Sequence, residues 1–260
     1  MDFLQEIQRL WIEKLDPRVV DFPLIQSSYY VPLIMFAYLY FVLRCGPRFM
    51  KNRQPYSLKT FIKLYNIIQI VANAWLVYDH IDAGMFKKKL LCPVILDYSY
   101  DSLRLCRTAW YYFLLKILDY IETGIFILRK KNNQVSGLHI YHHVSTLFLT
   151  WIGLRYLVIP PALINSLVNS FIHILMYTYY FLASYGPNVQ KAIAPMKQWI
   201  TKAQMIQFII LLLFCSTNFL PNCKVMTHWI IIVYNLNFII NFYLFYDFYK
   251  KTYNKSKIKV

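Results

Sequence analysis

Charged residues are scarce in this chain, and acidic ones are the scarcest. Only 15% of the 260 residues are charged, with 12 Asp and Glu against 28 Lys and Arg. A soluble domain usually carries about a quarter charged residues. The chain is instead 58% hydrophobic and 18% aromatic, and its mean hydropathy is +0.38. This balance excludes an ordinary soluble domain and indicates an integral membrane protein.

Other absences narrow the possible functions. Residues 1–22 lack the continuous apolar run of a signal peptide, so we expect the first apolar segment to direct membrane insertion. No low-complexity tract, long linker or internal repeat divides the chain, which predicts a single domain over residues 1–260. The sequence has no C-x-x-C pair, which argues against zinc held by thiolates. Its basic residues are scattered over short loops without a recognisable binding module, which argues against a nucleic-acid partner.

Seven apolar segments are long enough to cross a membrane as helices, which takes roughly 18–25 residues. This count predicts an all-α membrane protein with seven transmembrane helices. The segments lie at approximately 26–43, 61–79, 110–128, 138–157, 161–184, 203–220 and 227–249.

The basic residues also predict an orientation. More than half of the 28 Lys and Arg lie in the first, third and fifth loops between these segments and in the C-terminal tail. Lys and Arg gather in cytosolic loops, so we expect a lumenal N-terminus and a cytosolic C-terminus. This topology and attraction to anionic lipid account for most of the positive charge. A phosphate-rich substrate is the alternative, and composition alone does not choose between them.

The five cysteines divide by position. Cys45, Cys106 and Cys215 lie at or inside the apolar segments, where they fit packing thiols. Cys92 and Cys223 fall in two separate lumenal loops, an oxidising environment. We therefore predict a disulfide between Cys92 and Cys223.

The sequence His139-Ile-Tyr-His142-His143 opens the fourth segment and is the strongest functional signal. At about 100° per residue, the three imidazoles fall within roughly one-third of the circumference of a helix. Ionisable groups inside a membrane are costly and usually face the protein interior. Together they predict a reactive centre, whereas a lone histidine would fit a satisfied core residue, and His80 and His228 fit loop or interface positions.

Three other segments carry polar residues at helical spacing. Lys116, Asp119 and Thr123 share a face of the third segment, with Glu122 at its edge; the fifth carries Asn169, His173, Met176, Tyr177 and Tyr180, and the sixth Thr201, Gln204 and Gln207. Each set has an alternative reading: Lys116 with Asp119 as an ion pair that only fixes packing, the two glutamines as interhelical hydrogen bonds, and the tyrosines as an interfacial belt. Helix rise places these groups between the cytosolic face and the middle of the bilayer. The pattern predicts a cavity or tunnel for an amphipathic ligand with a cytosolic head.

With these motifs the sequence resembles the ELO family of very-long-chain fatty acid elongases. The resemblance runs in order from about residue 16 to 250, at the family's spacing. It is carried by Lys116-Ile-Leu-Asp119-Tyr-Ile-Glu122-Thr123, Leu128-Arg129-Lys130-Lys131, His139-Ile-Tyr-His142-His143, Asn169-Ser-Phe-Ile-His173-Ile-Leu-Met176-Tyr177 and Thr201-Lys-Ala-Gln204-Met-Ile-Gln207.

Two features depart from the family pattern. The family usually has K-x-x-E-x-x-D-T in the third segment, whereas this chain has Asp119 and then Glu122. The charge is kept, but each carboxylate differs in reach by one methylene. Family tails often carry a retention signal with lysine third from the end, and Ile258 holds that place here. Residence in the endoplasmic reticulum membrane is therefore implied by the resemblance.

The resemblance implies condensation of an acyl-CoA with malonyl-CoA to a 3-oxoacyl-CoA two carbons longer, with release of CoA and CO2. No metal or redox cofactor is implied, and the later steps would belong to a ketoreductase, a dehydratase and an enoyl reductase. His142 is expected to act as nucleophile or base, with His139, His143 and His173 supporting it. Asn169 and Gln204 would orient the thioester carbonyls. Basic residues at the cytosolic mouth would bind the CoA phosphates, and the candidates are Arg129, Lys130, Lys191, Lys197 and Lys202.

Two rival functions stay open at this stage. A membrane di-iron desaturase or hydroxylase also uses H-x-x-H-H boxes, but it needs about eight histidine ligands and this chain has 6 histidines. A seven-helix lipid receptor or transporter would fit the number of segments, but not polar groups confined to the cytosolic half. The sequence does not fix acyl length, unsaturation or whether the chain forms a homodimer.

Overall fold

All the regular secondary structure in the described part of the chain is helical. The computed structural model describes residues 15–87, 97–156, 158, 160–220 and 228–254, and within them it contains no strand. Short 3-10 or π segments adjoin several of the helices. The main helices are α2 (Tyr30–Tyr40), α3 (Gly46–Met50), α4 (Lys59–Asp82), α5 (Tyr100–Leu118), α6 (Tyr120–Leu128), α7 (Gly137–Tyr156), α8 (Pro160–Ala183), α9 (Pro187–Ser216) and α10 (His228–Tyr249).

Each of the seven predicted segments coincides over most of its length with one of these helices or helix pairs, so the all-α prediction is confirmed for the described residues. A π-helical turn joins α2 to α3 (Phe41–Cys45), and a single residue, Asp119, separates α5 from α6. The helices extend beyond the apolar segments. For example, α9 begins at Pro187, which occupies its first turn, whereas the apolar stretch begins near residue 203. Hydropathy marks the apolar part of a helix, and polar turns can continue it on either side.

Four helical segments are long and apolar enough to cross a membrane: Tyr30–Met50, Lys59–Asp82, Pro187–Phe219 and Ile230–Tyr253. The α5–α6 pair, α7 and α8 fall outside this set. They are the segments that carry Lys116, the two neighbouring carboxylates and the histidines. Polar residues inside the bundle thus lower the hydropathy of its central helices.

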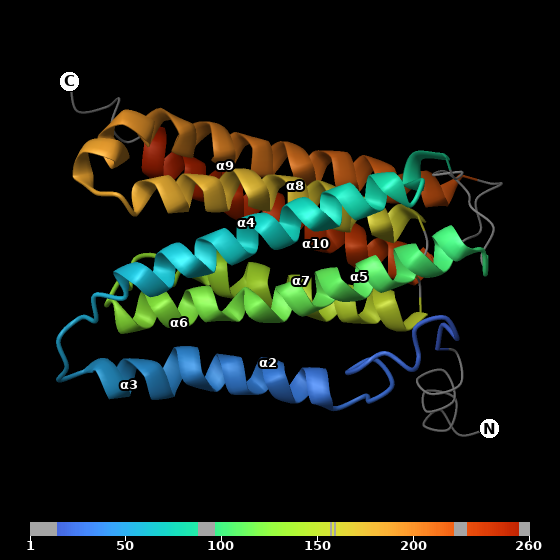
Figure 1. Cartoon of the computed structure of the whole chain (residues 1–260), viewed down its shortest axis with the longest axis horizontal. Coiled ribbons are helices and arrows are strands. Elements are labelled where there is room, and N and C mark those ends of the chain that lie inside the picture. The colour runs from blue at the N-terminus through green and yellow to red at the C-terminus, as the bar shows by residue number, and fades with distance from the viewer. Residues whose placement is uncertain (1–14, 88–96, 157, 159, 221–227, 255–260) are drawn as a thin grey trace.

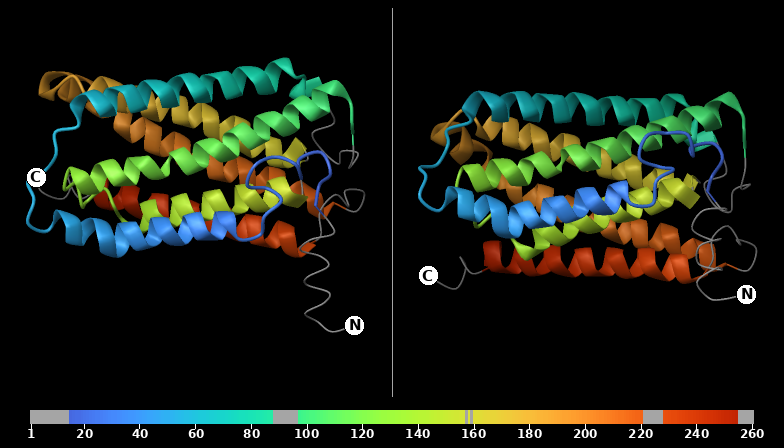
Figure 2. Two further views of the ribbon diagram at one scale, coloured as in Figure 1. Left: turned by 60° about the horizontal axis from the view of Figure 1, so that its bottom comes forward. Right: turned by 90° about the horizontal axis from the view of Figure 1, so that it is seen from below.

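Six helices form a closed ring. Around it, α4 packs on α8, α8 on α9, α9 on α10, α10 on α7, α7 on α5, and α5 back on α4. Helices α2 and α3 lie outside this ring, against α7 and α6, and form the lowest layer in Figure 1. Figure 2 shows the same long helices running side by side in two further directions. The ring creates an interior that can hold polar groups away from lipid.

The two ends of the bundle differ in charge. The turns between α3 and α4, between α6 and α7, and between α8 and α9 lie together with the end of α10 at the left of Figure 1. We call this the basic end, because it carries Lys51, Arg53, Lys130, Lys131 and Lys191.

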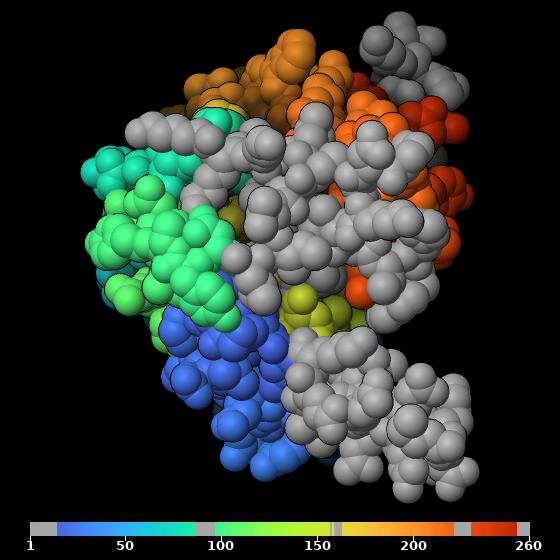
Figure 3. All heavy atoms as spheres, turned by 90° about the vertical axis from the view of Figure 1, so that its right-hand side faces the viewer, coloured from blue at the N-terminus to red at the C-terminus, as the bar shows by residue number. Residues whose placement is uncertain are grey.

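The opposite end is closed in part by the segment before α2. Buried Arg155 of α7 donates from Nη1 to the carbonyl oxygens of Ile25, Gln26 and Ser27, at 2.7, 3.2 and 2.8 Å. Figure 3 looks onto this end, where the start of α5 (green) lies beside the segment before α2 (blue). Trp110 of α5 also donates to the carbonyl oxygen of Pro23 at 3.1 Å. These contacts hold residues 23–27 against α5 and α7 of the ring.

Some sequence predictions lie outside the described residues or are wrong. Cys92 and Cys223, the predicted disulfide partners, and the lysines of the last six residues are outside them, as is the side chain of His228. His80 was expected in a loop or at an interface, but it is fully buried in α4. One of its ring nitrogens contacts the carbonyl oxygen of Leu76 at 2.7 Å and the other contacts Ser166 at 2.6 Å. The helix simply continues past the apolar stretch and places His80 against α8.

Candidate active site

The three clustered histidines lie in the first two turns of α7, near the basic end. The rings of His139 and His143 are 4.2 Å apart between centroids, and those of His142 and His143 are 5.8 Å apart. His139 contacts Thr123 of α6, and His142 contacts Asn241 of α10. The cluster therefore lies between the neighbouring helices of the bundle.

Thr123 connects His139 to the helix outside the ring. Its Oγ1 lies 2.8 Å from Nε2 of His139 and 3.0 Å from the hydroxyl of Tyr38 in α2. Thr123 is fully buried, and Tyr38 is nearly so. Because a hydroxyl can donate one hydrogen bond and accept others, Thr123 can hold both neighbours at once.

A second polar cluster surrounds the break between α5 and α6. The ammonium group of Lys116 donates to Asp119 Oδ2 and to Asn169 Oδ1, each at 2.9 Å. The hydroxyl of Tyr112 donates to the same oxygen of Asn169 at 3.0 Å. All four side chains are buried. The spacing of three residues between Lys116 and Asp119 brings them onto one face, as the sequence predicted.

Helix α4 completes this cluster with residues that the sequence analysis did not select. Gln69, which is fully buried, donates from Nε2 to Asp119 Oδ1 at 2.9 Å and to the hydroxyl of Tyr65 at 2.9 Å. Tyr177 of α8 donates to Asp119 Oδ1 at 3.2 Å. Asp119 therefore receives hydrogen bonds from side chains of three helices. The missed signal was the four-residue spacing of Tyr65, Gln69 and Asn73 within an apolar segment.

Two further histidine–carboxylate approaches are longer than hydrogen bonds, one in each cluster. Nδ1 of His173 lies 3.9 Å from Asp119 Oδ2 and has no hydrogen-bond partner within the described chain. Nε2 of His143 lies 4.0 Å from Glu122 Oε2. Both carboxylates are buried. The structure thus brings all four predicted histidines close to polar groups of the α5–α6 pair or α10.

Helix α10 contributes the other residues that the sequence analysis missed. Asn241 is buried, and its Oδ1 lies 3.1 Å from Nδ1 of His142. Its amide nitrogen donates to the backbone oxygen and to Oδ1 of Asn237, at 2.9 and 3.1 Å. Two asparagines four residues apart in an apolar segment were the available signal.

The comparisons with known proteins cover nearly the whole chain. The family model described as ELO: GNS1/SUR4 family matches residues 23–260. The chain is 36% identical to very long chain fatty acid elongase 4 of Mus musculus, over 93% of this chain and 77% of that protein. It is 34% identical to elongase 1 of the same species, over 93% and 88%, and 33% identical to elongase 7 of Drosophila melanogaster, over 98% and 79%.

The chain belongs to the ELO family.

In this ELO-family chain, the other polar residues that the sequence predicted for the site make weaker or fewer contacts with it. In the part of the chain that the structure describes, Gln204 makes only a weak contact, from Nε2 to the sulfur of Met176 at 3.8 Å. Gln207 is buried, and its Oε1 has no hydrogen-bond partner within the described residues. The ring of Tyr180 lies 6.1 Å from that of Tyr177. Thr201 is buried and donates to the backbone of its own helix at Lys197.

The predicted CoA-binding cations lie at the basic end. Arg129 and Lys130 follow the last residue of α6, and Lys130, Lys191 and Lys197 are exposed. Lys202 is partly buried, with its ammonium group 4.5 Å from the centre of the Trp199 ring. These residues come from two parts of the chain, and their placement is compatible with an anionic head group at this end.

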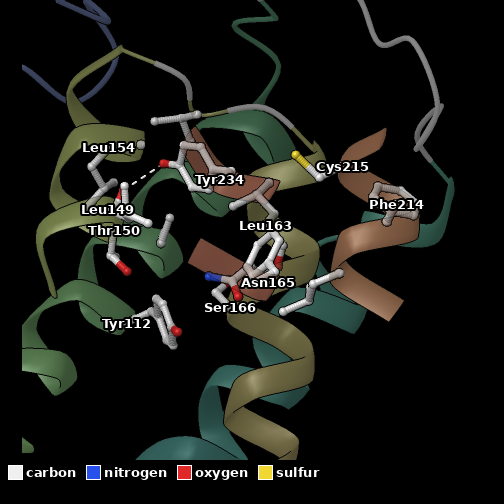
Figure 4. A pocket seen from close by; sticks show the side chains of 15 residues that line it. Tyr112, Leu149, Thr150, Leu154, Leu163, Asn165, Ser166, Phe214, Cys215 and Tyr234 are labelled. Carbon is white, nitrogen blue, oxygen red and sulfur yellow. Dashed lines mark hydrogen bonds between the residues drawn. The ribbon is translucent and has the colours of Figure 1, made fainter. Parts of the chain in front are cut away.

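A cavity lies in the other half of the ring, toward the opposite end. Side chains from α5, α7, α8, α9 and α10 line it, and most are apolar (Figure 4). Tyr234 reaches across to donate a hydrogen bond to the carbonyl oxygen of Leu149 at 2.7 Å. Glycine at position 153 leaves room for this approach, because a Cβ there would be 2.9 Å from the hydroxyl of Tyr234, which would have to shift. Gly153 and Tyr234 therefore set the width of the cavity on this side.

Within the described residues, no group of three or more His, Cys, Asp and Glu side chains is arranged to hold a metal ion. The histidines contact hydroxyl, amide and carboxylate groups instead, as described above. The arrangement provides imidazoles beside buried hydrogen-bond donors and acceptors. Such a set can perform proton transfer, nucleophilic attack and stabilisation of an oxyanion.

Proposed function

We propose that this chain is the condensing enzyme of fatty acid elongation. It would join an acyl-CoA to malonyl-CoA and form a 3-oxoacyl-CoA two carbons longer, CoA and CO2. Membership of the ELO family and the names of its relatives support this reaction. The observation that carries it is the meeting of the three imidazoles of α7 with buried polar groups of α6 and α10.

The reaction can be divided into two acyl transfers. In the first, His142 attacks the carbonyl carbon of the acyl thioester, the C–S bond breaks and CoA leaves as its thiolate. In the second, malonyl-CoA loses CO2, and the electron pair of the broken C–C bond forms the new bond to the acyl carbon. Departure of the imidazole then restores His142. A neutral imidazole is a sufficient acceptor, and decarboxylation supplies the carbanion without a redox cofactor.

The supporting residues fit roles in holding the substrates. Lys116 and Tyr112 bind the oxygen of Asn169, which fixes the direction in which its amide nitrogen points. That nitrogen, and the amide of Gln204, would donate to thioester carbonyls. His139, His143 and His173 would transfer protons or stabilise the oxyanion. The alternative, in which His142 acts only as a general base, uses the same residues without an acyl adduct.

The two ends of the bundle fit the two parts of an acyl-CoA. We infer that the basic end faces the cytosol and binds the CoA phosphates, with the N-terminus in the lumen of the endoplasmic reticulum. The seven helical segments would span its membrane as one domain and enclose a tunnel. The acyl chain would extend from the histidines toward the cavity behind Tyr234. The 3-oxoacyl-CoA product would pass to a ketoreductase, a dehydratase and an enoyl reductase. The exposed apolar surface is compatible with a homodimer.

A condensation assay tests the proposed reaction. Membranes that contain the chain receive malonyl-CoA labelled at C2 and a ladder of saturated and unsaturated acyl-CoAs, without NADPH. The expected product is labelled 3-oxoacyl-CoA, which accumulates because the reduction is blocked. Membranes that carry His142→Ala at equal folded amount should form none. Absence of product from every acyl-CoA would reject the proposal, and stoichiometric iron in the purified protein would point to the desaturase or hydroxylase alternative.

A further inference from the structure

The amide group of Asn241 has only one orientation that satisfies its surroundings. Its nitrogen donates to the backbone oxygen of Asn237 at 2.9 Å and to the side-chain oxygen of Asn237 at 3.1 Å. If the amide were reversed, its oxygen would face those two oxygens, and none of the three could donate. The observed orientation therefore places Oδ1 of Asn241 toward His142.

This orientation determines the protonation of His142. Oδ1 of Asn241 can only accept a hydrogen bond, and it lies 3.1 Å from Nδ1 of His142. Nδ1 must then carry the proton, and a neutral ring keeps its lone pair on Nε2. Within the described residues Nε2 of His142 has no hydrogen-bond partner. The free lone pair is the one that a nucleophile or a base needs.

The neighbouring contacts hold this arrangement in place. Tyr141, which precedes His142 in α7, donates to Oδ1 of Asn237 at 3.2 Å. The ring of His142 also packs against a pair of aromatic rings, with centroid distances of 6.1 Å to Phe208 and 5.8 Å to Phe245. Two successive residues of α7 are thus bound to two asparagines one turn apart in α10. The pair of asparagines fixes both the tautomer and the direction of the imidazole.

We propose that Asn241 is a positioning residue that keeps the proton on Nδ1 of His142 and leaves Nε2 free to react. The inference rests on the proposed condensing function. When Nε2 attacks the acyl carbonyl and the thiolate of CoA leaves, the ring becomes an acyl-imidazolium with its proton still on Nδ1. Oδ1 of Asn241 stabilises that charge by accepting the hydrogen bond. The proton stays on Nδ1 while CoA leaves as its thiolate, so the second transfer releases the imidazole as the neutral ring.

Two substitutions separate positioning from a structural role. Asn241→Leu removes both the acceptor for His142 and the donor for Asn237. Asn241→Asp keeps the acceptor but, as a carboxylate, loses the donor. A structural role in α10 predicts the same loss from both, because both lose the bonds to Asn237. Positioning predicts that the aspartate variant keeps most of the activity that the leucine variant loses.

The matched control is Asn235→Leu on the same helix. Asn235 donates to Ser216 of α9 at 3.1 Å, so this variant also loses one interhelical bond, away from the histidines. We expect Asn241→Leu to lower kcat about 10- to 100-fold with KM for the acyl-CoA nearly unchanged, as loss of an orienting partner usually does. Asn241→Asp should stay within about tenfold of wild type, and Asn235→Leu should match wild type.

The outcomes distinguish this inference from the proposed function. A wild-type protein that forms no 3-oxoacyl-CoA rejects the function before Asn241 is tested. A wild-type protein that does, beside an Asn241→Leu variant of equal kcat, rejects the positioning role. Equal losses in folded Asn241→Asp and Asn241→Leu also reject it. If Asn241→Asp does not fold, the kcat of the folded Asn241→Leu fraction against Asn235→Leu decides the matter.

Discussion

Replacing Asp119 by leucine should destabilise this protein strongly, because it leaves the ammonium group of Lys116 buried without its counter-charge. Lys116 is 3% exposed and Asp119 2%, and their charged atoms are 2.9 Å apart. The carboxylate also receives hydrogen bonds from Gln69 and Tyr177. Removal of one member of a buried ion pair costs about 3–5 kcal/mol. At roughly 2–4 °C per kcal/mol for a large domain, Tm should fall by about 6–20 °C.

The double variant Lys116→Met with Asp119→Leu should recover most of that loss, because an apolar pair of similar volume often replaces a buried ion pair without cost. The activity of the double variant also distinguishes two roles of the Lys116–Asp119 pair. If the pair only fixes packing, activity should return together with stability. If it positions Asn169 for the substrate, activity should stay about 10- to 100-fold low in a protein of nearly normal Tm.

Thermal unfolding in detergent, followed by tryptophan fluorescence, measures the first effect, and the condensation rate below both Tm values measures the second. The control is Asp247→Leu, which removes the partner of Lys251 in an exposed pair of 2.6 Å between the last turns of α10 and the π-helical turn after it. An exposed pair contributes about 0–1 kcal/mol, so its Tm should hardly change. An Asp119→Leu protein that unfolds within about 2 °C of wild type would refute the argument from burial.

Three further variants test other contacts. Gly153→Val should displace Tyr234 and narrow the cavity; kcat/KM for the longest accepted acyl-CoA should fall about 10-fold or more, while short ones stay unchanged. An equal loss for all lengths would contradict this placement of the acyl chain. Thr123→Val leaves Nε2 of His139 without its hydrogen-bond partner, so kcat should fall about tenfold while the protein still folds. An unaltered kcat would show that Thr123 has no role in the reaction. Arg155→Met should lower the free energy of unfolding by about 2–4 kcal/mol, because three backbone oxygens lose their donor, and a melting curve equal to wild type would argue otherwise.

The parts of the site that the sequence predicted share one property: they are local. The three histidines lie within five residues, and Lys116 pairs with Asp119 three residues away in the chain. Helical periodicity alone brings such residues to one face. The apolar segments likewise predicted the helices, although the helix ends differ where polar turns continue them, as at Pro187.

The parts that were missed depend on contacts between distant segments. Gln69 reaches Asp119 across 50 residues, and His142 meets Asn241 across 99 residues. The order of helices around the ring decides these pairings, and no periodicity within one segment contains that order. The role of Gly153 was missed for the same reason, because it depends on the approach of Tyr234 from the distant helix α10. His80 was misplaced because hydropathy falls before its helix ends.

The most direct test of the account is a two-step trapping experiment on purified protein. Acyl-CoA alone is added first, and mass spectrometry of the peptides locates any acyl group; malonyl-CoA is then added to the same sample. We predict an acyl adduct on His142 formed with an equal amount of free CoA, which malonyl-CoA then discharges as 3-oxoacyl-CoA. Covalent catalysis at His142 would be contradicted by an adduct on another residue that discharges to the same product. A His142→Ala protein that condenses at the wild-type rate would contradict the central role of this histidine altogether.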